Sequence, residues 1–167
     1  ASFPVGIWRW IAVTPKHIIF LGVALHFLAC CIWELINTDV FGAGSIKVKL
    51  EKAWEHMKSW VRAHGLACSQ SRFTRASLQI RDSYSYPEPK AKAHNARVMM
   101  GWMADLTNEC LHDGACTDAT LRATAAWAIA DLCALCDAHR SWKLSVDLAN
   151  IMAERIMTFL QSYQRLA

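Results

Sequence analysis

Glycine and proline are scarce in this 167-residue chain, with only 7 and 4 copies. A β-sandwich or β-barrel needs turn residues about every 8 to 12 positions, so their scarcity argues against an all-β fold. Charged residues are also few, at 19% against 54% hydrophobic residues. A chain with so much apolar side chain to bury is not disordered. The composition therefore predicts a folded helical protein with one core and, at most, an appendage.

Motifs for the common reactions are missing as well. The sequence has no glycine-rich phosphate loop, no nucleophile elbow and no His-Glu-x-x-His pair. The acids of the later helical segments fall mostly on polar faces, where solvation explains them: Asp105, Glu109, Asp131, Asp137, Asp147 and Glu154. We predict that the chain is not an enzyme.

The cysteines do not form the pattern of a secreted disulfide framework. There are seven of them, an odd number, and several lie inside helical patterns. Free cysteine usually behaves as a small buried hydrophobe, which indicates a reducing compartment. Zinc is a weaker alternative, with donors at Cys133, Cys136 and His139 and further donors at Cys110, His112 and Cys116. Because the first three are spaced i, i+3, i+6 on one helix, they diverge, and we predict no metal site.

The longest apolar run extends from His17 to Trp33 without a formal charge, and it reaches 20 residues at Ile36 with Glu34 as its one acid. At about 1.5 Å per residue, that length spans a hydrocarbon core of roughly 30 Å. Two interpretations stay open, a transmembrane helix and the buried central helix of a soluble bundle. We expect the transmembrane helix and therefore membrane lipid as a partner.

His26 lies in the middle of this apolar run. An imidazole in apolar surroundings needs a partner for its ring nitrogens. In a membrane helix, His26 would serve as the axial ligand of a tetrapyrrole such as chlorophyll. In a soluble core it would instead form a hydrogen bond with a neighbouring group.

After the break at residues 39–45, apolar residues recur at spacings of three and four. This period predicts four amphipathic helices, at 46–64, about 90–111, about 118–139 and about 145–163. Gly65 is expected to end the first, and Thr117 to cap the third. The predicted fold is all-α, with an N-terminal segment at 1–44 that carries the hydrophobic helix and a helical bundle domain at 45–167.

An irregular connector at 66–89 is predicted to run over the surface of the bundle. Six basic side chains in or beside it form a candidate contact for an anionic partner: Arg72, Arg75, Arg81, Lys90, Lys92 and Arg97. Interleaved aromatic residues suit nucleic acid, and the same charges suit lipid headgroups or a protein. Alternatively, these residues belong to a solvent-exposed loop that binds no partner.

Four tryptophans of the bundle domain are candidate anchors for packing or for contact with other protein subunits. They are Trp54, Trp60, Trp102 and Trp142. Aromatic side chains are enriched at both kinds of contact.

The strings TPKHIIFLGVALHFLACCIWELI, AWEHMKSWVRAHGLACSQSRFT, YPEPKAKAHNARVMMGWMADL and TFLQSYQRLA occur in this order. Together they resemble transposase-like open reading frames that are abundant in dinoflagellate genomes. The resemblance implies a His-x-x-Asp-Leu-Gly motif whose acid contributes to a metal-binding site. Here the motif spans His17 to Gly22, and Phe20 stands where the acid would be. A phenylalanine cannot bind magnesium, so the resemblance implies a catalytically inactive remnant.

The resemblance also implies an algal source. In that setting we expect a non-enzymatic accessory or scaffold subunit of a larger membrane-associated complex, such as a pigment-bearing organelle complex. The alternative is a soluble, transposase-derived helical module in the nucleus or cytoplasm, which binds nucleic acid through the basic connector.

Overall fold

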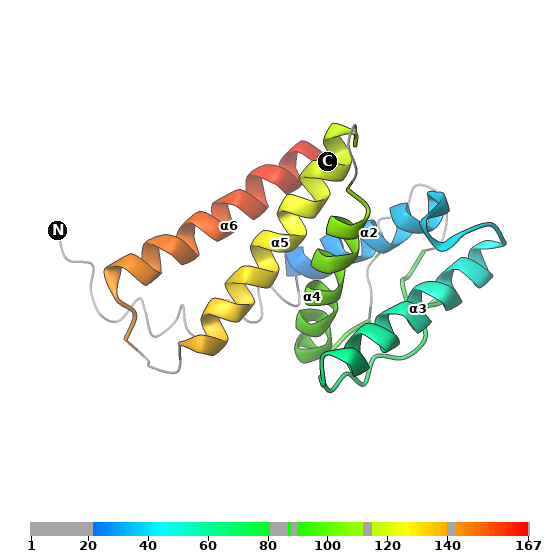
Figure 1. Ribbon diagram of the computed structural model, residues 1–167, viewed down its shortest axis with the longest axis horizontal. Helices are drawn as coiled ribbons and strands as arrows, with labels where there is room; N and C mark the ends of the chain where they lie inside the picture. Colours follow the sequence, from blue (N-terminus) through cyan, green and yellow to red (C-terminus); the bar gives the residue numbers. More distant parts are fainter. Residues whose placement is uncertain (1–21, 81–86, 88–89, 112–114, 140–142, 167) are drawn as a thin grey trace.

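The computed structural model describes residues 22–80, 87, 90–111, 115–139 and 143–166. Within these ranges the chain is all-α, as predicted. The elements are α2 (Ala24–Asn37), the short 3-10 helix η2 (Asp39–Phe41), α3 (Ile46–Ala63), α4 (Ala93–Glu109), α5 (Thr117–Ala138) and α6 (Val146–Leu166). Figure 1 shows α5 and α6 side by side as a hairpin, α4 next to α5, and α3 at the other end of the molecule.

Local sequence features determine where α3 begins and ends. After η2, Gly42 and Gly44 adopt positive φ angles of 73° and 145°. Ser45 then caps α3, because its side chain accepts from the backbone N–H of Val48. At the other end Gly65 has φ 62°, and its N–H and that of Leu66 donate to the carbonyls of Arg62 and Val61. This is a Schellman motif, which confirms the predicted end at Gly65.

The cap predicted at Thr117 is wrong. Thr117 is the first residue of α5, and Cys116 occupies the cap position without a side-chain hydrogen bond. The helix begins one residue earlier than the sequence pattern predicts. Such patterns locate helix ends only to within a few residues.

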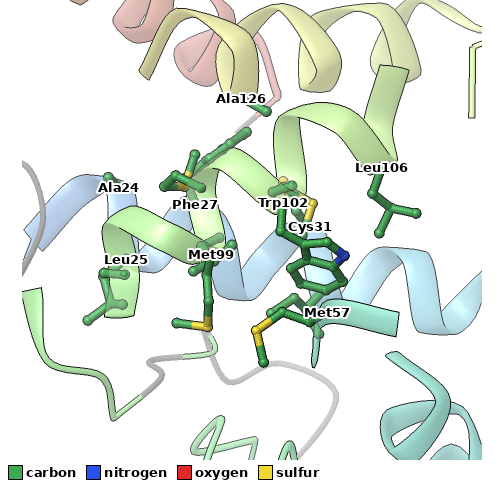
Figure 2. Close-up of a cluster of buried hydrophobic side chains, with 14 of the residues drawn as sticks. Ala24, Leu25, Phe27, Cys31, Met57, Met99, Trp102, Leu106 and Ala126 are labelled. Carbon is green, nitrogen blue, oxygen red and sulfur yellow. The ribbon is translucent and has the colours of Figure 1, made fainter. Parts of the chain in front are cut away.

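Most of α2 is buried inside the protein. Nine of its 14 residues are buried, among them Phe27, Leu28 and Ile32. Figure 2 shows Ala24, Leu25, Phe27 and Cys31 in one cluster with side chains of α3, α4 and α5. The central-helix interpretation describes this part of the chain, and the transmembrane interpretation is not confirmed.

One helix of the described ranges, α5, is long and apolar enough to cross a membrane, with a mean hydropathy of 1.3. Of its most apolar window, 44% is buried. Core helices of soluble proteins have the same composition, so this observation is weak support for a membrane.

The connector is not only a surface loop. Phe73, Leu78 and Ile80 are buried, and Phe73 stacks on Trp102 with ring centroids 5.9 Å apart. The side chain and backbone of Thr74 exchange hydrogen bonds with Ser77 and close a tight turn between the buried residues. The prediction of a surface connector holds for the exposed arginines and not for these apolar residues, which close the core beneath them.

Candidate functional site

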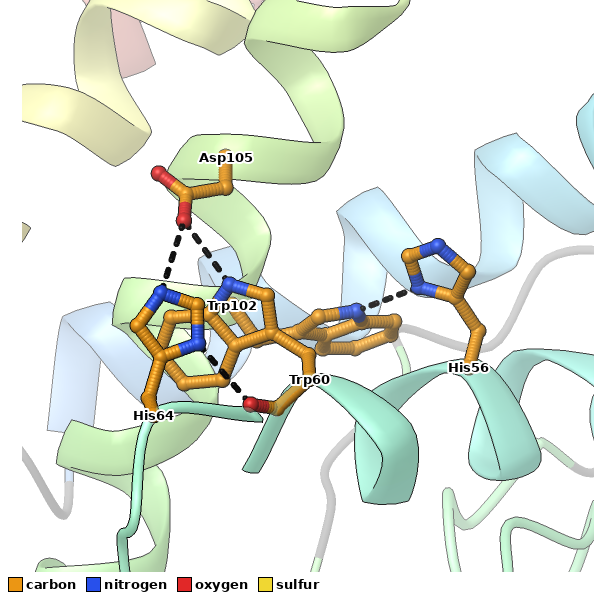
Figure 3. A network of polar contacts seen from close by, with 5 residues as sticks. All are labelled: His56, Trp60, His64, Trp102 and Asp105. Carbon is orange, nitrogen blue, oxygen red and sulfur yellow. Dashed lines mark hydrogen bonds and ion pairs between the residues drawn. The ribbon is translucent and has the colours of Figure 1, made fainter. Parts of the chain in front are cut away.

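A network of aromatic and polar side chains joins α3 to α4 (Figure 3). The indole N–H of Trp60 donates to Asp105 Oδ2 over 2.8 Å, and Nε2 of His64 lies 3.9 Å from the same oxygen. The ring of His64 stacks on Trp60 at 4.1 Å, and its Nδ1 lies 2.9 Å from the Trp60 carbonyl. Because a carbonyl oxygen only accepts, Nδ1 carries the hydrogen in this contact.

The buried half of this network is the pair Trp102 and His56. Trp102 has no exposed surface, and its indole N–H donates to Nδ1 of His56 over 2.9 Å. A buried donor without an acceptor is costly, so His56 stabilises the position of Trp102. His56 and Asp105 each accept a hydrogen bond from an indole N–H across the two helices, so the arrangement holds α3 against α4.

Gly101 makes room for this network. A Cβ at residue 101 would lie 3.1 Å from the Trp60 ring. A larger residue would therefore push the indole away from Asp105. The sequence pattern of α4 does not reveal this role, because nothing local to Gly101 requires a glycine.

The four predicted tryptophan anchors have different surroundings. Trp102 is completely buried and packs within the chain, so it is not an interface residue. Trp60 is half-buried within the network, and Trp142 lies outside the described residues. Trp54 is also half-buried, under the cationic groups of Lys58 at 4.6 Å and Arg72 at 5.3 Å. Its indole N–H is buried with no acceptor within the described part of the chain.

The predicted basic residues differ in their surroundings. Arg72 forms an ion pair with Glu51 at 3.3 Å, and Arg97 forms one with Asp137. The guanidinium of Arg75 lies 5.9 Å from the centre of the Trp33 ring. Lys90 and Lys92 are exposed, and Arg81 lies outside the described residues. Two of the six cations are thus already neutralised within the molecule.

The metal and tetrapyrrole predictions concern separate places. His26 is half-buried in the first turn of α2. Cys133 is buried and Cys136 is exposed, while Nε2 of His139 lies 2.8 Å from the carbonyl of Lys143. His112 lies outside the described residues. Among the residues that are described, no group of three His, Cys, Asp or Glu side chains could hold a metal ion.

None of the seven cysteines forms a disulfide bond, and five of them are buried or partly buried. Burial raises the pKa of Cys133 to about 12 from an ordinary value of 9.0, and burial raises the pKa of Cys31 well above that value. The pKa values of Cys30 and Cys110 are raised for the same reason. Since the thiolate is the reactive form, these four side chains are poor nucleophiles.

Sequence reasoning missed an ion pair that ties α2 to α5. Arg122 is only 7% exposed and pairs with Glu34. Glu34 interrupts an apolar run, and such an isolated acid is the signal that a cationic partner lies nearby. A carboxylate is costly in lipid, whereas here the side chain of Glu34 is half exposed and pairs with the buried Arg122.

A second missed feature is the outward face of α6. Of its 21 residues only Phe159 and Ser162 are buried. Val146 is 76% exposed, Met157 52% and Leu160 42%. At about 100° per residue, Val146 and Met157 project on the side opposite Phe159, and Leu160 lies at the edge of that side, roughly a quarter turn from Phe159. Their spacing of 11 and 3 residues was visible in the sequence, but nothing local showed that α5 would cover the other stripe.

Comparison with protein-family models, with curated proteins and with solved structures finds no match for this chain.

Proposed function

We propose that this chain is a non-enzymatic docking subunit of a larger protein assembly and that it binds its partner through the outward face of α6. The single observation that carries the proposal is the exposure of Val146, Met157 and Leu160 on a helix whose opposite stripe already packs on α5. Burial of such a side chain contributes about 1.5–3 kcal/mol. An apolar stripe left in water therefore favours association.

The charges beside the stripe indicate the chemistry of the partner. Asp147 and Glu154 are exposed beside the stripe, and Glu154 also pairs with Arg155, whose Nη1 lies 3.6 Å from its Oε2. An amphipathic helix from another subunit, with apolar residues on one face and basic residues beside them, would complement this surface.

The test compares two double variants in the cells that make the chain. Met157→Glu with Leu160→Glu places charge in the stripe, whereas Ser59→Glu with Ser71→Glu adds the same charge at exposed polar positions of α3 and the connector, outside α6. We expect the unchanged chain and the Ser59 and Ser71 variant to elute in a complex on size-exclusion chromatography, and the Met157 and Leu160 variant to elute alone. A photo-crosslinker at residue 160 then identifies the partner. Elution of the unchanged chain as a monomer, or of both variants with the complex, would refute the proposal.

Membrane anchoring by residues 17–36 is proposed separately, and its support is the apolar sequence of that segment. Insertion of α2 into a membrane would remove Phe27, Leu28 and Ile32 from the core. The loss of these buried contacts disfavours insertion. Alkaline-carbonate extraction decides between the two states, because an integral helix stays in the pellet. If the chain is an accessory subunit that carries a pigment at His26, a visible absorption spectrum of the native complex will show it, and His26→Ala will remove it.

The alternative, a transposase-derived module that binds nucleic acid, has weaker support because Arg72 and Arg97 are already paired within the chain. It requires an affinity for DNA or RNA that falls steeply with salt concentration. Absent or salt-independent binding would remove it.

A further inference from the structure

A pocket of about 310 Å³ opens between the beginning of α3 and the turn at 73–75. It is lined by Lys47, Leu50, Phe73, Thr74 and Arg75. This volume lies at the lower end of the range for small-molecule sites, about 300–1,000 Å³. Since α3 lies at the other end of the molecule from the α5–α6 hairpin (Figure 1), the pocket is independent of the docking face.

The apolar part of the pocket is firmly held. Leu50 and Phe73 are 1% and 4% exposed. Phe73 stacks on Trp102, which is itself fixed by the hydrogen bond to His56. Because the core holds Phe73 and Leu50 in place, these side chains would not need to change conformation when a ligand binds.

The polar part of the pocket is cationic. Lys47 and Arg75 are exposed beside it. No acid lines the pocket among the residues that the structure describes, and the carboxylate of Glu51 is engaged by Arg72. Lys47 also lies in the first turn of α3, where the helix dipole disfavours a cation. An anion bound here would offset the unfavourable position of Lys47 and would be attracted by both cations.

We propose that this pocket binds a small amphipathic anion, with a carboxylate or phosphate head between Lys47 and Arg75 and the first carbons of an apolar chain against Leu50 and Phe73. A nucleobase fits the lining less well. Its edge requires polar partners, and the hydroxyl of Thr74 already accepts from the backbone N–H of Ser77 over 2.9 Å.

The experiment measures binding of decyl phosphate to the full chain by calorimetry, below the concentration at which the amphiphile forms micelles. Inorganic phosphate and decyl maltoside test the head and the chain separately. We expect decyl phosphate to bind at least about tenfold more tightly than either, since charge and apolar burial both contribute. Shortening the chain should weaken binding, because fewer CH₂ groups are then removed from water.

Two variants assign the binding to this pocket. Lys47→Ala with Arg75→Ala removes both rim cations and should weaken binding of decyl phosphate by at least about tenfold. Lys58→Ala with Arg62→Ala removes the same charge from exposed positions further along α3 and should leave the affinity within about twofold. Circular dichroism confirms that both variants are folded.

The source of the ligand is tested with vesicles. If vesicles of phosphatidylglycerol bind the chain, vesicles of phosphatidylcholine do not, and the Lys47 and Arg75 variant loses binding, the ligand is a membrane lipid. Binding of decyl phosphate without binding of vesicles indicates a free metabolite. Equal affinity for decyl maltoside, or unchanged affinity in the Lys47 and Arg75 variant, would overturn the proposal. The proposal would also be wrong if the chain bound no amphiphile but bound a single-stranded oligonucleotide through Lys47 and Arg75.

Discussion

Trp102 shows how one residue connects the core to the polar surface of this protein. Its ring is completely buried, yet its N–H reaches His56, a residue of the exposed face of α3. The sequence indicated an aromatic residue on a helical stripe and could not indicate the acceptor, because His56 is separated from it by 46 positions.

Replacement of His56 by alanine should destabilise the protein by about 1–3 kcal/mol, because the buried N–H of Trp102 then has no acceptor. Urea denaturation monitored by circular dichroism measures the change. His94→Ala is the control, since Nε2 of this exposed histidine lies 2.8 Å from the carbonyl of Ala67, and its loss should cost under about 1 kcal/mol. Equal effects of the two substitutions would contradict the role of His56.

The pKa of Cys133 predicts how stability depends on alkaline pH. Below pH 9.0 the thiol is protonated in both the folded and the unfolded chain, and above that value only the unfolded chain releases the proton until about pH 12. The free energy of unfolding should therefore fall across this window by about 1.4 kcal/mol per pH unit from this group.

Urea denaturation at several pH values within this window checks the prediction. Cys133→Ala should show a shallower decline, whereas the exposed control Cys116→Ala should keep the slope of the unchanged chain. Parallel declines for all three chains would mean that Cys133 does not titrate as expected.

At the scale of elements, the period of the apolar residues predicted the later helices well. The observed bounds of α3, α4, α5 and α6 differ from the predicted ones by a few residues. What the period could not show is which apolar stripe another helix covers. In α6, Ile151 and Leu160 are part of the apolar pattern, yet they are 40% and 42% exposed.

The end of α3 offers a clean test of one such local signal. Gly65 has a φ of 62° and open space around its Cβ position. Gly65→Ala should therefore cost about 1 kcal/mol through backbone conformation alone. Gly22 also has open space but no positive φ, so Gly22→Ala should be close to neutral or slightly stabilising. Thermal denaturation of both variants measures the difference, and a neutral Gly65→Ala would refute the assigned strain.

At the scale of the whole molecule, α2 and the later helices share one core. The ring of Phe27 contacts Phe159 and Tyr163 of α6 with centroids 5.4 Å and 5.7 Å apart. Arg122 of α5 pairs with Glu34 of α2. These contacts join residues that the predicted division at 44/45 assigns to different domains.

A chain of residues 45–167 should therefore lose its cooperative unfolding transition, because removal of α2 exposes apolar residues of α4 and α5. A chain of residues 22–167 keeps every contact that the structure describes and should unfold cooperatively. Circular dichroism and calorimetry compare the two. A cooperative transition in the shorter chain would support the division at residue 44.

The sequence alone determined that this chain is helical, approximately where the helices lie and how α3 ends, because these properties depend on the period of apolar residues and on neighbours within about four positions. Only the tertiary structure decided the rest. It buried α2 against α4 and α5, gave Glu34 and Trp102 their distant partners, and left one stripe of α6 in water. These outcomes depend on which faces meet across tens of residues, and the same apolar run satisfies a membrane and a protein core equally well.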